Sequence, residues 1–449
     1  MKRMTGWSRL LPVLCVLLLV ASAQAVTLDA CIAAALRQNP DVRAASERVK
    51  AAQASLREAQ SAYYPRLGAS AAYARTDNPP QAFMMQLNQR SASLQSDFNN
   101  PEDTDNLALS LGVQYRLFDF GRRELDTRMA REGSEISRLV LRGLQNELIH
   151  QVTRGYYAVL QAEAFTAVRE ETVQTLEESL RVARERLAAG GAVKTDVLNL
   201  DVQLAQANDE LIRSRNGVAL SLAALNTAIG ADLAGTNDMP VKRELLAARP
   251  EAGADPAVIR ERPEYLAAEQ MAIVRNAGVQ KARRQYAPVV NGFGSMDWNS
   301  GGASEFEQSY MVGVQAEVTL FDGFQRSAGV ANAEAQERAA RDDVDKAANN
   351  LKLDLVSASL QAGEAWDRLA VARKSIENAE EALRITREKY KLGAADIPEL
   401  LTAQVGLSGT RTRNVAALYD CLTALSNLER ARGTLVKQYA KNINGESMP

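Results

Sequence analysis

Two acidic residues, Asp196 and Glu399, occupy equivalent places in a chain whose sequence pattern occurs twice. The segment LFDFG at 117–121 returns as LFDG at 320–323, and Asp196 and Glu399 share the same offset of 203 positions. If several copies of the chain meet around one axis, these carboxylates form a ring, which is a common construction of a cation-selective constriction. The alternative is that both are ordinary acids of a first helical turn, where the helix dipole favours negative charge. The repeat therefore points to selectivity and gating at these positions.

The N-terminus reads as a secretory signal over residues 1–25. Three basic residues precede or border an apolar run at 10–20, and Ala-Gln-Ala at 23–25 forms a cleavage site of small residues. We therefore expect the mature chain to begin at Val26. No later run reaches about 18 apolar residues, so we predict no transmembrane helix, and any membrane crossing must use strands closed into a barrel.

The sequence offers no arrangement of side chains that indicates catalysis. His150 is the single histidine, and no cluster has metal-ligand spacing, so we predict a protein that is not an enzyme and needs no metal or cofactor. The formal net charge of −2 gives no sign of nucleic-acid binding. In an exported protein, Cys31 and Cys421 either form a disulfide or remain two buried thiols, and the sequence leaves both possibilities open.

Alternating segments predict four strands in two hairpins. The period is two from Leu107 to Leu117 and from Tyr310 to Leu320, and it is weaker over 67–73 and 289–298. A polar segment at 75–106 is predicted as the loop that joins the first pair. One alternative is a soluble sheet with one wet face. The strand lengths, which are those of membrane-crossing strands at about 9–11 residues, favour a barrel instead.

The two faces of these strands differ in polarity. The side chains predicted to face a barrel lumen are Gln114, Arg116, Gln315 and Glu317. Those predicted to face lipid are Leu109, Leu111, Val113, Val312 and Val314. Because a single-chain barrel needs at least about eight strands, four strands cannot close one, and several chains must each supply four.

Each strand pair is followed by a very long helical hairpin. Apolar residues near both turns are spaced three and four apart, which is the seam of a coiled coil. The predicted long helices are 122–188, 195–229, 325–391 and 398–435, and the glycines that interrupt them are Gly190, Gly191 and Gly393. Proline-bounded helices at 41–62 and 264–286 precede the strands in the two copies.

This ordered arrangement, seen twice, resembles the TolC family of outer-membrane channel proteins from Thr27 to about Gly433. The resemblance implies a homotrimer in which four strands per chain form a twelve-stranded outer-membrane barrel. A long α-helical coiled-coil tunnel then continues this barrel through the periplasm. It also implies a periplasmic adaptor and an inner-membrane pump as partners, and drugs, metals or secreted proteins as cargo. The fold class is therefore mainly α with a β-barrel part, internally duplicated.

The resemblance also assigns roles to residues at the periplasmic entrance. Thr195 and Asp196 match one side of the network that closes the entrance, and Tyr390 matches the other side. The best-known family member has an arginine where this chain has Ala395, so the charged link is expected to be absent here. Gly190, Gly191 and Gly393 would be the tips at which an adaptor docks, although turn chemistry alone also explains them.

These observations divide the chain into a signal peptide (1–25), a first repeat (26–230), an equatorial linker (231–261) and a second repeat with a short tail (262–449). The predicted function is passive conduction from an inner-membrane pump and adaptor to the exterior, in an efflux pump or a type I secretion system. The alternative is a structural or adhesive envelope-spanning trimer without transport. The sequence does not identify the substrate.

Overall fold

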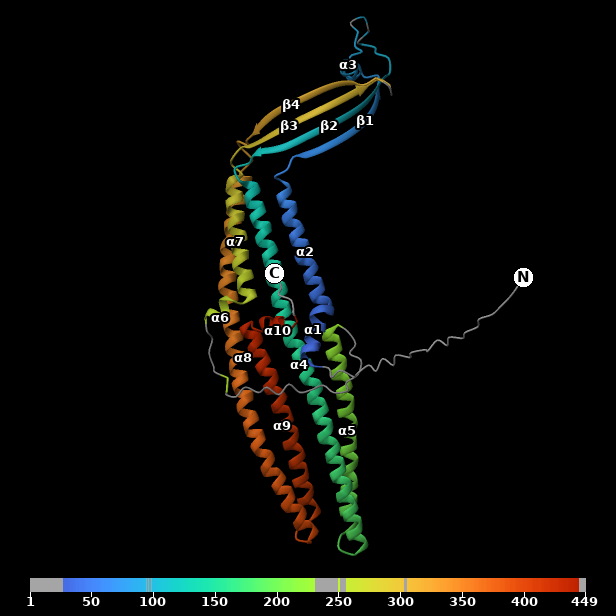
Figure 1. The fold of residues 1–449 in the computed structure, drawn as a ribbon, viewed down its shortest axis with the longest axis vertical. Helices are drawn as coiled ribbons and strands as arrows, with labels where there is room; N and C mark the ends of the chain where they lie inside the picture. The colour runs from blue at the N-terminus through green and yellow to red at the C-terminus, as the bar shows by residue number, and fades with distance from the viewer. Residues whose placement is uncertain are drawn as a thin grey trace, which may run out of the picture.

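The computed structural model describes residues 27–93, 95, 97, 99–230, 249–250, 256–302 and 305–443. Figure 1 shows a four-stranded sheet at one end of the molecule and long helices that run from it to two turns at the other end. The signal peptide (1–25), most of the predicted linker (231–261) and the tail beyond residue 443 lie outside the described residues. Among the helices that are described, none is both long enough and apolar enough to span a membrane.

The sheet is antiparallel, with the strand order β1-β2-β3-β4. The strands are β1 (Arg66–Thr76), β2 (Thr104–Phe118), β3 (Val289–Ser300) and β4 (Glu307–Glu317). The prediction of four strands in two hairpins is confirmed. The prediction that the last strand reaches Leu320 is wrong, because the pairing of β4 stops where Glu317 meets Val289. Pro288 directly precedes Val289, and proline has no N–H with which to extend the ladder.

The segment predicted as a loop, 75–106, contains the helix α3 (Pro79–Asn88). Asn78 caps this helix, since its side chain accepts a hydrogen bond from the backbone N–H of Gln81 at 3.5 Å. Proline in the first helical turn has no N–H to leave unsatisfied and is already set in a helical φ angle. The asparagine and proline that suggested a loop are therefore the start of a helix.

Six helices form a wall below the sheet (Figure 1). They are α2 (Pro40–Ser61), α4 (Arg122–Ala188), α5 (Lys194–Ile229), α7 (Pro263–Arg284), α8 (Gln325–Lys391) and α9 (Ile397–Arg432). The helices α4 and α8 have 67 residues each, so each extends about 100 Å at 1.5 Å per residue. Near the sheet α4 packs against α2 and α7, and farther away it packs against α5 and α9, while α8 packs against α7 and α9. Hence α2 and α5 form one edge of the wall and α8 forms the other.

The predicted ends of α4 and α8 are confirmed, but the end predicted for the last long helix is wrong. Instead of reaching Leu435, α9 stops at Arg432, because Gly433 has a φ of 71° and turns the chain. A separate helix, α10 (Leu435–Ile443), follows it.

In both repeats, a side chain donates a hydrogen bond to a backbone carbonyl near the end of a long helix. The Asn39 Nδ2 donates to the carbonyl of Ala228 at 2.9 Å, and the Arg262 Nη1 donates to the carbonyl of Ala431 at 2.5 Å. The two acceptors are 203 positions apart, so these bonds are equivalent in the two copies. Arg262 is only 3% exposed and also donates to both carboxylate oxygens of Glu264, at 3.0 and 2.9 Å. These bonds join the start of α2 to the end of α5 in the first repeat, and the start of α7 to the end of α9 in the second.

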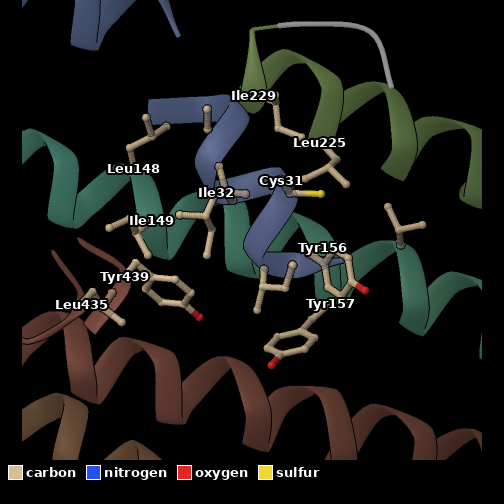
Figure 2. Close-up of a cluster of buried hydrophobic side chains, with 14 of the residues drawn as sticks. Cys31, Ile32, Leu148, Ile149, Tyr156, Tyr157, Leu225, Ile229, Leu435 and Tyr439 are labelled. Atoms are coloured by element: carbon tan, nitrogen blue, oxygen red, sulfur yellow. The ribbon is translucent and has the colours of Figure 1, made fainter. Parts of the chain in front are cut away.

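Two further short helices, α1 (Leu28–Gln38) and α6 (Pro256–Arg260), pack against the middle of the wall. Figure 2 shows the main apolar cluster there, in which Cys31 and Ile32 of α1 lie against Tyr156 of α4 and Leu225 of α5. Cys31 and Cys421 are both fully buried, belong to different clusters and are free thiols. Of the two possibilities that the sequence left open, the structure has the unpaired thiols, and burial raises the pKa of the Cys31 thiol to about 11.

Candidate functional site: the two hairpin tips

Glycines shape both turns at the end of the wall. Gly190 and Gly393 have φ angles of 74° and 75°, a left-handed conformation that glycine adopts without strain. After the first of them, the backbone N–H of Gly191 returns to the carbonyl of Arg186 at 2.8 Å and closes the end of α4. The corresponding bond in the second copy runs from Ala394 to the carbonyl of Lys389, also at 2.8 Å. The turn role of these glycines is thus visible in the geometry, and a docking role remains a prediction.

Asp196 lies in the first turn of α5, where its carboxylate accepts a hydrogen bond from the backbone N–H of Val193 at 3.4 Å. The start of α9 in the second copy is capped differently, because there the Asp396 carboxylate accepts a hydrogen bond from the backbone N–H of Glu399 at 2.9 Å. Asp396 and Val193 are equivalent positions in the repeat. The sequence reasoning therefore missed a third carboxylate at the tips, and the signal for it was an acid directly before Ile397 and Pro398 at a helix start.

The predicted entrance residues differ in their surroundings. Glu399 and Thr195 are exposed in the first turns of their helices, and Asp196 is half-buried. Tyr390 is only 4% exposed, and its hydroxyl has no hydrogen-bond partner among the described residues. Burial raises the pKa of this hydroxyl, the nearby Arg186 opposes the rise, and the charge of Asp196 adds to it.

Arg186 of α4 joins the two hairpin tips. Its Nη1 donates to the carbonyl of Tyr390 at 2.8 Å, and its Nη2 donates to the carbonyl of Gly191 at 3.0 Å. The guanidinium carbon also lies 4.6 Å from the centre of the Tyr390 ring, which is cation–π geometry. One side chain thus ties the end of α4 to its own turn and to the end of α8.

This contact is not the charged link that the family resemblance leads us to expect to be absent, so that expectation stays a prediction. Ala395 does lack a charge, and its side chain packs on the apolar cluster of the tips. Arg186 donates to a backbone carbonyl of the second hairpin in the same chain. The two copies differ at this position, since residue 389, equivalent to 186, is a lysine, but this difference does not identify Tyr390 as the partner of Arg186.

An apolar seam lies behind the tips, where the sequence places a coiled coil. Buried residues of all four long helices form one cluster there: Val173, Leu176, Leu180, Ala183, Leu200, Ala207, Leu211, Leu383, Tyr390, Ile397, Leu400 and Leu407. Polar contacts cross between the hairpins within it. The Gln404 Nε2 donates to the Ser179 Oγ at 2.7 Å, and the hydroxyls of Thr172 and Ser408 lie 3.0 Å apart. The two hairpins are thus fixed to each other by few polar bonds over a continuous apolar base.

In the sheet, the strand register separates polar from apolar rows. Residues directly opposite each other on neighbouring strands share a face, and Arg116, Asn291 and Gln315 are such a row. The adjacent row on the other face is Tyr115, Gly292 and Val314. The polar residues Gln114 and Glu317 continue the first face, and Leu109, Leu111, Val113 and Val312 continue the second. This register is consistent with the predicted lumen and lipid faces, which no contact in the single chain tests.

The chain is similar to known proteins in both sequence and fold. A family model described as "Outer membrane efflux protein" matches residues 31–231 and 257–434. The alkaline protease secretion protein AprF of Pseudomonas aeruginosa is 23% identical over 350 residues, which cover 76% of this chain and 72% of that protein. The probable efflux pump outer membrane protein TtgC of Pseudomonas putida is 24% identical over 416 residues, covering 90% of this chain and 82% of TtgC. The fold matches the Campylobacter jejuni CmeC outer membrane channel with a TM-score of 0.80 at 15% identity, covering 93% and 90% of the two chains.

Proposed function

We infer the working assembly of this protein from one premise: the chain belongs to the outer membrane efflux protein family, whose members are exit channels of the outer membrane. The similarity to the TolC family is thereby confirmed. The chain is an outer-membrane channel protein, and its long helices extend from the sheet into the periplasm. How copies of the chain assemble depends on the surfaces that a single chain leaves exposed.

We propose a homotrimer in which the sheet and the helical wall both close into rings. The sheet has two outer strands, β1 and β4, each with one edge that carries no partner strand in the order β1-β2-β3-β4. An open edge is a template for pairing with another chain. Pairing β4 of one chain with β1 of the next closes the sheet, and three chains supply the twelve strands that the family resemblance implies.

The observation that carries this proposal is a pair of exposed apolar stripes at the two edges of the wall. On α5 the exposed stripe is Leu198, Val202, Ile212 and Leu220, and on α8 it is Leu353, Leu360, Val371 and Ile385. At about 100° per residue, each stripe falls on one face of its helix, opposite the face that packs inside the chain. Exposed fractions of 67% for Ile212 and 68% for Val371 show how little of each stripe the single chain covers.

Two different edges that fit each other make a head-to-tail interface, which closes into a ring. The α8 edge and β4 lie on one side of the chain, and the α5 edge and β1 lie on the other. One rotation therefore joins the helices and the strands at the same time. Apolar stripes on a helix away from its own core are typical of an interface between proteins.

Within this trimer, we propose that Asp196 and Glu399 contribute to a ring of carboxylates at the periplasmic entrance, with Asp396 beside them. Thr195 and Tyr390 belong to the closure of that entrance. Rings of acidic side chains favour cations over anions in a pore. The two tips carry these acids close to the turns, which is the support for the proposal.

The remaining assignments rest on the same assembly. Gly190, Gly191 and Gly393 are proposed as the tips that meet a periplasmic adaptor, and an inner-membrane pump feeds the channel through that adaptor. The polar rows with Gln114, Arg116, Gln315 and Glu317 line the barrel lumen. Relatives named for protease secretion and for efflux both occur, so we propose that the pump, rather than the channel wall, selects the substrate.

Reconstitution in planar lipid bilayers tests the proposed channel and its entrance. The purified protein is expected to conduct ions with a preference for cations, and Asp196→Ala combined with Glu399→Ala is expected to reduce that preference. An unchanged reversal potential in the double variant rejects the carboxylate ring.

Native mass spectrometry tests the interface separately. The protein is expected as a trimer, and Ile212→Glu, which places a charge on the α5 stripe, is expected to shift it to monomers. Asn208→Glu adds the same charge at an exposed position of α5 outside the stripe and should leave the trimer intact. Equal dissociation by both variants would contradict the proposed interface.

A further inference from the structure

We propose that a cavity between the two helical hairpins binds a small, uncharged, mainly apolar molecule that carries one N–H or O–H donor. The cavity has a volume of about 340 Å³ and is lined by α4, α5 and α9, with Leu383 contributed by α8. Pockets that hold small molecules usually have volumes of roughly 300–1,000 Å³. The lining comes from one chain, so the site is complete without a second copy.

The need for a donor follows from Gln404, which lines the cavity and is 6% exposed. The Ser179 hydroxyl donates its one proton to the carbonyl of Thr175 at 2.8 Å, so its oxygen accepts from the Gln404 Nε2 at 2.7 Å. This fixes the orientation of the Gln404 amide. Its Oε1 has no hydrogen-bond partner in the part of the chain that the structure describes. Because a buried acceptor without a partner is unfavourable, a bound molecule that reaches this oxygen from the cavity is favoured when it carries a donor.

The absence of charge on the molecule follows from the charged side chains around the cavity. Arg169 pairs with Glu210 at 2.7 Å, and Arg411 pairs with Glu171 at 2.5 Å and with Glu380 at 2.9 Å. Every charge that lines the cavity therefore already has a partner of opposite sign within the protein. An ion would have to break one of these pairs, whereas an uncharged molecule leaves them intact.

The rest of the lining favours an apolar body. Its apolar side chains are Val168, Leu176, Ala207, Leu383, Val405 and Leu407. Burying an apolar ring against such side chains is favourable in proportion to the area removed from water. A single donor on that ring can then be directed at the Gln404 Oε1. The bound molecule would touch both hairpins, since α4 and α9 belong to different ones.

Two fluorinated probes test the site on the purified full chain. 5-Fluoroindole is uncharged and carries one N–H, and 1-methyl-5-fluoroindole has the same ring without the donor. We expect saturable binding of 5-fluoroindole in ¹⁹F NMR titrations, about tenfold tighter than that of the methylated probe, which is the factor expected for one buried hydrogen bond. Uptake of either probe by detergent does not saturate and is the same for all variants.

Variants locate the binding. Gln404→Met removes the acceptor, so the two probes should bind alike. Ala207→Phe fills the cavity and should weaken both probes at least tenfold. Gln361→Met makes the same chemical change at an exposed glutamine outside the cavity and should preserve the preference.

Three outcomes would overturn the proposal. The first is the absence of saturable binding, which is expected of a cavity that holds only water. The second is equal binding of the two probes to the unaltered protein, and the third is a preference for 5-fluoroindole that survives Gln404→Met. The probe comparison on the unaltered protein decides the question even if a variant folds poorly. None of these measurements requires channel activity, so the result is independent of the proposed function.

Discussion

Replacing Arg186 by alanine is expected to loosen the contact between the two hairpin tips and to favour an open entrance. The substitution removes two hydrogen bonds to carbonyl oxygens, at 2.8 and 3.0 Å, and the contact with the Tyr390 ring. The bond to Gly191 lies within the first hairpin, so only the Tyr390 carbonyl and ring contacts cross to the second hairpin. At a half-buried position, each of these two contributes about 0.5–1.5 kcal/mol, for a total of about 1–3 kcal/mol per chain. Since about 1.4 kcal/mol corresponds to a factor of ten, separated tips should become roughly 5- to 140-fold more favourable relative to joined tips.

Single-channel recording in planar bilayers measures this effect as a rise in open time or conductance. Lys389→Ala is the matched control, because Lys389 is the exposed equivalent of Arg186 in the second copy. Tyr390→Phe sharpens the test. It keeps the ring and the backbone carbonyl and removes only the hydroxyl, which has no hydrogen-bond partner in the described residues, so it should leave the channel nearly unchanged. The reasoning is refuted if Lys389→Ala opens the channel as much as Arg186→Ala, or if Tyr390→Phe does.

Three further predictions concern stability and assembly. Arg262→Ala leaves Glu264 and the carbonyl of Ala431 without their partner and should lower the free energy of unfolding by about 3–5 kcal/mol in denaturant titrations. The control Lys437→Ala breaks an exposed pair with Glu261 and should lower it by at most about 1 kcal/mol. Burial works to raise the pKa of Glu264, but Arg262 holds it below its usual value of 4.5. The contribution of the Glu264 carboxylate to the free energy of unfolding is therefore expected to be fully present above pH 4.5 and to be lost as the pH falls below that value. In thermal melts, the Glu264→Gln variant should lack this part of the pH dependence. Val312→Arg places a charge on the predicted lipid face and should impair membrane assembly far more than Gln315→Arg; equal amounts of membrane-inserted trimer would contradict the assignment of faces.

Much of the fold could be predicted from local sequence signals. The ends of α4 and α8 match the predicted ranges because glycine turns stop both helices. The four strands could be predicted from a period of two in the sequence, and each predicted strand or long helix has a counterpart in the other copy of the repeat. The errors lie where a local signal has two meanings. Pro79, for example, begins α3 although the polar segment around it predicts a loop.

At the hairpin tips, some contacts join residues that are far apart in the sequence, and these could not be predicted. The glycines could be identified because they lie at the turns themselves, and Tyr390 because the family resemblance implies its role. Arg186 could not, because its partner Tyr390 is 204 positions away and the contact exists only when the two hairpins pack side by side. Asp396 was missed for a different reason: the repeat pairs it with Val193, so the comparison of copies hid an acid that only the second copy has.

In the proposed trimer, the α8 edge of one chain meets the α5 edge of the next. Ile212 lies 18 positions after the start of α5, and Val371 lies 20 positions before the end of α8, so the two are at similar heights above the tips. Cys31 and Cys421 are buried and give little background reaction; Cys15 lies in the predicted signal peptide. Oxidation of the Ile212→Cys, Val371→Cys double variant is therefore expected to produce covalent trimers on a denaturing gel, with no cross-linked product from either single variant. A double variant that stays monomeric while native mass spectrometry still shows a trimer would contradict the proposed interface.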